Sequence, residues 1–127
     1  MNYLLDTHTF MWFINGEEEL SAHARKTIEH KNSNNFVNIA SIWEIAIKLS
    51  IGKLKLKTLF IEIPEQISNN GFQILPLRFE DTLKLSTLPF HHRDPFDRLL
   101  IAQSIANQLT IISKDKQFSD YGIDMIW

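Results

Sequence analysis

The stretch DPFDRLLIAQ at residues 94–103 is followed, after a short gap, by TIIS at residues 110–113. Asp94 is a suitable N-cap, Pro95 suits the first helical position and Asp97 the third, so a helix is predicted to begin here. The apolar, β-branched run at 110–113 predicts a short buried strand. A helix that leads into such a strand is typical of a βαβ unit, in which the strands are parallel.

The same alternation extends over the whole chain. Strands are predicted at 2–5, 36–39, 72–75, 110–113 and 123–127. Helices are predicted at 8–15, 22–31, 41–51, 59–70, 79–87 and from 94 onward, with a short one at 116–120. This order indicates an α/β fold with a central, mostly parallel sheet that helices cover on both faces.

The composition favours a single globular domain over residues 1–127. The chain is 44% hydrophobic and 22% charged, and it has a net charge of −2. There is no cysteine, no basic and apolar leader, and no apolar run of the roughly 20 residues that span a bilayer. We therefore expect a cytoplasmic protein without a membrane segment. With this charge, a phosphate-bearing substrate would need a local basic patch or metal ions to offset the acids.

Four acidic residues lie where a predicted strand ends or a predicted helix begins: Asp6, Glu44, Asp97 and Asp115. In a parallel α/β sheet these places lie along one edge, so side chains more than 100 positions apart are expected to meet there. Ordinary structural roles are open for each acid as well. Ser41 and Glu44 fit an S-x-x-E capping box, and the others suit helix caps, a first helical turn or a loop turn.

A cluster of carboxylates calls for a cation. Oxygen-only ligands favour Mg²⁺ or Mn²⁺, and such ions can activate a water for attack on a phosphodiester. Cysteine ligands are excluded, and the five histidines form no recognisable zinc spacing. The adjacent pair His91 and His92 is not expected to bind a metal, because neighbouring side chains usually point in different directions.

Four blocks of sequence carry a resemblance to a known family. They are LLDTH at 4–8, SIWEIAIK at 41–48 with GKL at 52–54, HRDPFDRLLIAQ at 92–103, and ISKD at 112–115. Together they resemble the PIN-domain family and, within it, the VapC-type toxins of toxin–antitoxin pairs. The resemblance implies a three-layer α/β/α fold and metal-dependent endoribonuclease activity.

The resemblance also assigns roles to residues. Asp6 and Asp97 would bind Mg²⁺ or Mn²⁺, and Glu44 and Asp115 would act directly or through water. The activated water would attack an RNA backbone phosphate in line. Thr7, Asp94 and Ser113 stand beside these acids and are predicted to support the site.

The partners implied by the resemblance are an RNA substrate, a small antitoxin protein and a second copy of the chain in a homodimer. Basic residues next to the acidic motifs are the candidates for guiding RNA. They are Lys48, Lys53, Arg93, Arg98 and Lys114.

Other functions are open. The fold would also suit an RNA processing or decay nuclease that is not a toxin, or a catalytically silent binding module. An aspartyl-phosphate phosphatase would need a second Asp two positions after Asp6, where His8 stands. A receiver-type phosphoacceptor domain would need an Asp after the third strand, and residues 72–76 contain none.

Overall fold

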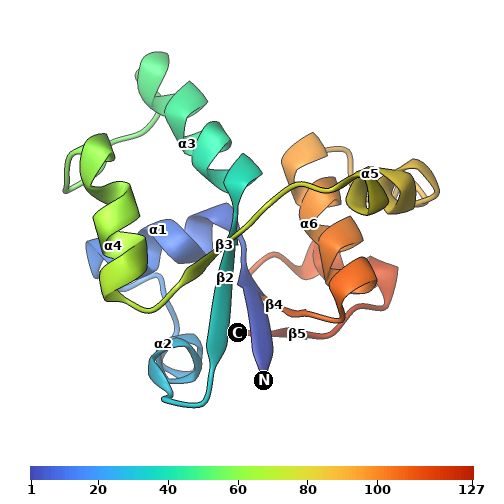
Figure 1. Cartoon of the computed structure of the whole chain (residues 1–127), viewed down its shortest axis with the longest axis horizontal. Coiled ribbons are helices and arrows are strands. Elements are labelled where there is room, and N and C mark those ends of the chain that lie inside the picture. The colour runs from blue at the N-terminus through green and yellow to red at the C-terminus, as the bar shows by residue number, and fades with distance from the viewer.

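A five-stranded, wholly parallel sheet forms the centre of the computed structural model, which describes residues 1–127 (Figure 1). Its order is β3-β2-β1-β4-β5, so the first strand lies in the middle. The strands are β1 (Asn2–Leu5), β2 (Asn34–Asn38), β3 (Gln73–Leu75), β4 (Thr110–Ile112) and β5 (Met125–Ile126). The chain therefore builds one half of the sheet, returns past β1 and builds the other half. This places a topological switch point between β1 and β4.

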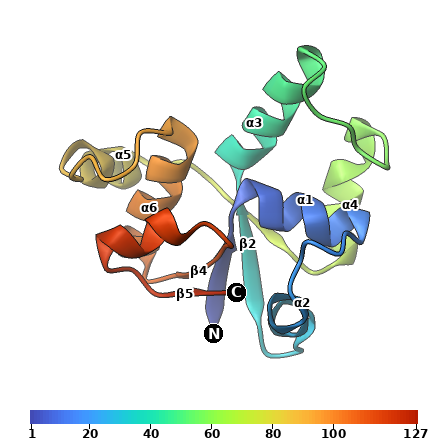
Figure 2. The same cartoon turned by 180° about the vertical axis from the view of Figure 1, so that it is seen from behind.

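Helices cover both faces of the sheet. They are α1 (Thr7–Asn15), α2 (Ala22–Glu29), α3 (Ile39–Ser50), α4 (Ile63–Asn69), α5 (Phe79–Ser86) and α6 (Pro95–Asn107), with 3-10 turns η1 (Phe60–Glu62) and η2 (Lys116–Tyr121). Helices α1, α2 and α4 lie on one side, and α5 and α6 lie on the other (Figures 1 and 2). The predicted α/β/α layering is confirmed, and none of the helices is both long and apolar enough to cross a membrane.

Side chains along the central strands β1 and β4 point alternately to the two faces of the sheet, which explains why there are two hydrophobic cores. Leu5 and Ile112 point into the cluster under α1, α2 and α4, whereas Leu4 and Ile111 point into the cluster under α6. All four are completely buried. Successive side chains of a strand face opposite sides, so a strand covered on both faces must be apolar throughout.

The capping box predicted at Ser41 and Glu44 is wrong. Helix α3 begins at Ile39, and its N-cap is Asn38, whose side chain accepts a hydrogen bond from the Ala40 N–H at 2.6 Å. Strand β2 ends on Asn38 itself, so the helix starts without a connecting loop. Glu44 therefore lies in the second turn of α3 and is free for contacts outside the helix.

Asn38 also joins this helix start to α6, which gives a test of the assignment. Its amide donates to Gln103 Oε1, and Gln103 in turn donates to Pro76 O and Asp81 Oδ2. Asn38→Ala should lower the free energy of unfolding by about 1–3 kcal/mol, because a cap is lost and a buried amide loses its partner. Urea denaturation of Asn38→Ala and Ser41→Ala measures this. A larger loss in Ser41→Ala would restore the original capping assignment.

Candidate metal and catalytic site

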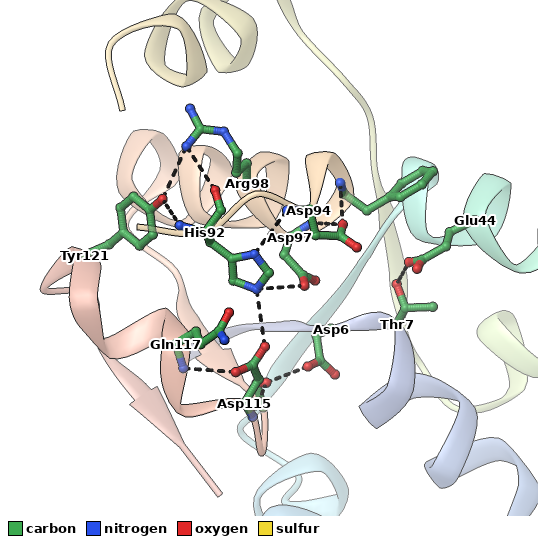
Figure 3. Close-up of polar contacts among 12 residues, drawn as sticks. Asp6, Thr7, Glu44, His92, Asp94, Asp97, Arg98, Asp115, Gln117 and Tyr121 are labelled. Atoms are coloured by element: carbon green, nitrogen blue, oxygen red, sulfur yellow. Dashed lines mark hydrogen bonds and ion pairs between the residues drawn. The ribbon is translucent and has the colours of Figure 1, made fainter. Parts of the chain in front are cut away.

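The four predicted acids gather at the carboxyl edge of the sheet, around the switch point (Figure 3). Asp6 directly follows β1 and caps α1, and Asp115 follows β4 and caps η2. Asp97 lies in the first turn of α6, and Glu44 approaches from α3. Acids from four separate segments of the chain therefore lie at the same edge of the sheet, as predicted.

Asp6 lies deepest and is held by two donors. Its Oδ1 accepts from the Thr9 N–H at 2.8 Å, and its Oδ2 accepts from the Ser113 hydroxyl at 2.5 Å. Ser113 is completely buried, and its oxygen also accepts from the Asp115 N–H at 3.0 Å. Burial raises the pKa of Asp6, although the hydrogen bonds from Ser113 and Thr9 oppose the shift. Ser113 thus links Asp6 and Asp115 by hydrogen bonds.

Glu44 is held by its neighbours rather than by a helix end. Its Oε1 accepts from the Thr7 hydroxyl at 2.7 Å, and its Oε2 forms an ion pair with Lys48 Nζ at 3.1 Å. Thr7 is the residue after Asp6, so this hydrogen bond ties α3 to the end of β1. Glu44 is buried, and its side chain is only 10% exposed. Lys48, predicted to guide RNA, serves here as the counter-ion of a site acid.

Asp97 carries the clearest electrostatic sign of a cation site. Its pKa is raised from an ordinary 3.8 to about 7, first by burial and then by the negative charge of Asp94, with Asp6 and Glu44 adding to the effect and His92 opposing it. Asp94 caps α6 as predicted, since its Oδ1 accepts from the N–H groups of Phe96 and Asp97 at 2.8 and 3.1 Å. Asp94 therefore orients Asp97 through the backbone while its charge opposes ionisation of Asp97.

His92 is the site residue that the sequence prediction missed. Its Nε2 lies 3.1 Å from Asp97 Oδ2 and 3.3 Å from Asp115 Oδ2, and one ligand atom from each of the three residues fits within 4.8 Å. The prediction was right that adjacent histidines diverge, because His91 is exposed and packs against Tyr121. The sequence did indicate this position for His92, because it stands two residues before Asp94, the N-cap of α6, and therefore at the same edge of the sheet as Asp97.

The remaining basic candidates differ in position. Lys53, Arg93 and Lys114 are exposed. Lys114 lines a shallow cavity of about 210 Å³ together with Asp6, His8, Trp12 and Asp115.

Arg98 lies elsewhere. It is buried, and its guanidinium donates to Pro89 O at 2.9 Å and to Tyr121 Oη at 3.2 Å while it stacks on Phe90. Arg98 therefore supports the 85–92 segment from inside the protein and is not available to bind a substrate.

The donor set fits a hard divalent cation. The clustered acids offer only carboxylate oxygens, and burial disfavours their ionised forms unless a positive charge is added. Asp97 Oδ1 accepts no hydrogen bond within the protein, and Asp97 and Asp115 are partly exposed, so a hydrated ion can reach them. Each oxygen of Asp6 and Oε1 of Glu44 accepts one hydrogen bond, and Glu44 Oε2 pairs with Lys48, which leaves lone pairs for ligation.

A parallel sheet between two layers of helices, with acidic side chains at its switch point, defines a three-layer α/β/α domain. The chain belongs to the PIN domain family, whose model matches residues 3–124. This confirms the family expected from the four sequence blocks.

Solved structures share the fold over nearly the whole chain. VapBC2 from Rickettsia felis, bound to a promoter DNA fragment, is 18% identical with a TM-score of 0.72, covering 99% of this chain and 98% of that one. A toxin–antitoxin complex from Klebsiella pneumoniae is 13% identical with a TM-score of 0.67, and FitAcB from Neisseria gonorrhoeae is 15% identical with a TM-score of 0.68. Each of these two matches covers 98% of this chain and 96% of the other. A search of curated proteins gave no match.

The raised pKa of Asp97 predicts a pH-dependent stability in EDTA. Between about pH 4 and 7 the folded protein keeps the Asp97 proton that the unfolded chain releases, so the free energy of unfolding contributed by this group falls as pH rises. Asp97→Asn removes the effect. The variant should be more stable than wild type at pH 8, on the order of 1–4 kcal/mol, and nearly equal to it near pH 4.

Urea denaturation of both proteins across this range, with the exposed Asp120→Asn as a charge-matched control, makes the measurement. A difference between wild type and Asp97→Asn that does not change with pH would contradict the assignment.

Proposed function

We propose that this protein is a Mg²⁺- or Mn²⁺-dependent endoribonuclease that acts as the toxin of a toxin–antitoxin pair. The observation that carries the proposal is the meeting of Asp6, Glu44, Asp97 and Asp115 at the switch point of a PIN-family sheet. An RNA substrate is consistent with action in the cytoplasm. The domain proposed to perform the reaction is the whole of residues 1–127.

Asp6 and Asp97 would hold the cation, with Glu44 and Asp115 ligating it directly or through water. When bound, the ion would supply an activated water and stabilise negative charge on the scissile phosphate and on the leaving oxygen. The fit of the oxygen-only donor set and the burial of Asp6 support this assignment.

The protein's own residues prepare the carboxylates for this task. Ser113 holds Asp6 and Asp115 together, Thr7 and Lys48 fix Glu44, and Asp94 sets the first turn of α6 on which Asp97 stands. Because these contacts exist before substrate arrives, little reorganisation is required when a phosphate enters.

Side chains beside the acids suit a single-stranded RNA. Lys114 borders the cavity next to Asp6, and Arg93 and Lys53 are exposed cations that would contact flanking phosphates. Trp43 is 63% exposed, and its ring stands edge-on to Phe96 at 5.5 Å. Trp43 and Phe96 stand on α3 and α6, the helices that also carry Glu44 and Asp97, and stacking of an unpaired base on them is part of the proposal.

A protein partner is supported by an apolar groove between α3 and α4. The groove has a volume of about 380 Å³ and is lined by Ile39, Ile42, Phe60, Ile61, Ile63, Pro64, Ile67 and Ile74. Several of these side chains are exposed, Ile61 to 83%. An antitoxin segment with apolar side chains is the proposed occupant, since a structurally similar protein is part of a toxin–antitoxin complex. The homodimer expected from the resemblance is retained as part of the proposal.

RNA cleavage tests the enzyme. Purified protein with Mn²⁺ or Mg²⁺ should produce discrete cuts in a panel of tRNA, rRNA fragments and mRNA. EDTA should abolish the cuts. Asp6→Asn and Asp97→Asn should each lower the rate at least about 100-fold, since each removes a charged ligand and an interaction with the reacting phosphate worth several kcal/mol.

Asp120→Asn, purified identically, is the control for handling and for charge. Cuts that persist in both site variants would identify a contaminating ribonuclease. RNA binding without cleavage in the wild type would instead support a silent binding module.

Growth tests the toxin role. Induced expression of the wild-type chain should arrest bacterial growth, expression of Asp6→Asn should not, and Asp120→Asn should arrest growth like wild type. Colony counts after induction, with protein levels matched by immunoblot, make the comparison. A chain that cleaves RNA in vitro but leaves growth unchanged would be a processing or decay nuclease.

A further inference from the structure

His92 joins two acids that belong to different segments of the chain (Figure 3). Its Nε2 lies 3.1 Å from Asp97 Oδ2 on α6 and 3.3 Å from Asp115 Oδ2 beyond β4. The ring is only 8% exposed and packs against Phe118. One buried imidazole therefore fixes the separation of two carboxylates that lie 18 residues apart in sequence.

The hydrogen bonds of the ring determine its tautomer. Nδ1 accepts from the Asp94 N–H at 3.2 Å, so it carries no proton in this arrangement. The ring proton is then on Nε2, which forms a hydrogen bond with Asp115 Oδ2 and lies 3.1 Å from Asp97 Oδ2. A nitrogen that holds a proton offers no lone pair to a cation, and His92 is therefore a donor to the acids.

Groups outside the acidic cluster set the position of His92. Its backbone N–H donates to Tyr121 Oη at 2.9 Å, and its carbonyl accepts from Arg98 Nη1 at 3.4 Å. Tyr121 Oη in turn donates to Pro89 O at 2.8 Å. Tyr121 and Arg98 thus hold the backbone of His92 from outside the acidic cluster.

The same contacts leave one oxygen free. Asp115 uses Oδ1 to accept from the Gln117 N–H and Oδ2 to accept from His92. Asp97 uses Oδ2 for His92, and its Oδ1 receives no donor from the protein. We propose that His92 is a positioning residue that holds Asp97 and Asp115 at a fixed separation and presents Asp97 Oδ1 to the divalent cation. This role rests on the proposed metal-dependent function.

Binding of Mn²⁺ to the whole chain, followed by calorimetry at one fixed pH, tests the role. His92→Leu removes the Nε2–H group that faces both carboxylates and should weaken Mn²⁺ binding about 10- to 100-fold, as loss of a hydrogen bond to a ligating group typically does. His92→Gln, whose amide N–H₂ can replace Nε2–H, should recover part of the loss. The matched control is His91→Leu, which alters the adjacent exposed histidine and should bind Mn²⁺ like wild type.

Four further measurements separate positioning from ligation and from misfolding. Pulsed electron paramagnetic resonance of bound Mn²⁺ should lack the nitrogen coupling of a coordinated imidazole, and long-range ¹H–¹⁵N correlations without metal should show the His92 proton on Nε2. Tyr121→Phe keeps the imidazole of His92 but removes the hydroxyl that accepts from the His92 backbone N–H. This variant should therefore weaken Mn²⁺ binding by less than His92→Leu does. Circular dichroism in EDTA verifies that each variant is folded.

The outcomes distinguish the two proposals. If wild type binds no Mn²⁺, the metal-dependent function fails, and the role of His92 toward a metal fails with it. If wild type binds Mn²⁺ and His92→Leu binds it equally well, only the role of His92 is overturned. A nitrogen coupling from His92 would make it a ligand and would also overturn the positioning role.

Discussion

The parallel pairing of β1 with β4 is the constraint on which the site depends. It places Leu5 beside Ile112, and the Asp6 N–H donates to Ile112 O at 3.3 Å. The next residues along the two strands, Asp6 and Ser113, then stand side by side although 107 positions separate them. Thr9 adds a second link, because its hydroxyl donates to the same Ile112 carbonyl at 3.0 Å. A change of register by one residue would turn Asp6 and Ser113 toward opposite faces and dismantle the cluster.

Carboxylates brought together in this way oppose folding unless a cation neutralises them. Burial raises the pKa of Asp6, and burial together with the negative charges of Asp94, Asp6 and Glu44 raises the pKa of Asp97. The two apolar cores on either side of β1 and β4 supply the compensating free energy, since Leu4, Leu5, Ile111 and Ile112 are fully buried. The arrangement is typical of a functional site, where the packing of the surrounding core compensates for locally unfavourable interactions.

Sequence reasoning succeeded where a local rule and the tertiary structure agree. The alternation of strands and helices predicted a parallel sheet covered on both faces, and Asp94 before Pro95 predicted the start of α6 within one residue. It failed at Glu44 because two candidate caps compete there. Asn38, at the end of β2, starts the helix one turn before Ser41, and the S-x-x-E spacing does not register that the strand runs directly into the helix.

His92 and Arg98 were misjudged for a different reason: their roles depend on contacts that no spacing rule contains. His92 turns inward because Tyr121, 29 positions later, receives its backbone N–H. Arg98 looked like a surface cation beside an acidic motif, but the carbonyls of the 85–92 segment surround its guanidinium. In both cases the deciding partners lie in irregular backbone, whose unpaired carbonyl and N–H groups must find side-chain partners when buried.

The segment 92–98 therefore contains both a site acid, Asp97, and the residues that hold this acid in position. Asp94 caps α6 with its side chain and fixes the His92 tautomer with its backbone N–H. Asp97 lies three residues after Asp94, with its Oδ2 3.1 Å from His92 Nε2, and Arg98 donates a hydrogen bond to the carbonyl of His92. Arg98 has no contact with the acids, yet its removal would free the loop that positions His92 and leave several buried carbonyls without a donor. The geometry of the acidic cluster therefore depends on Arg98, although this residue contacts none of the acids.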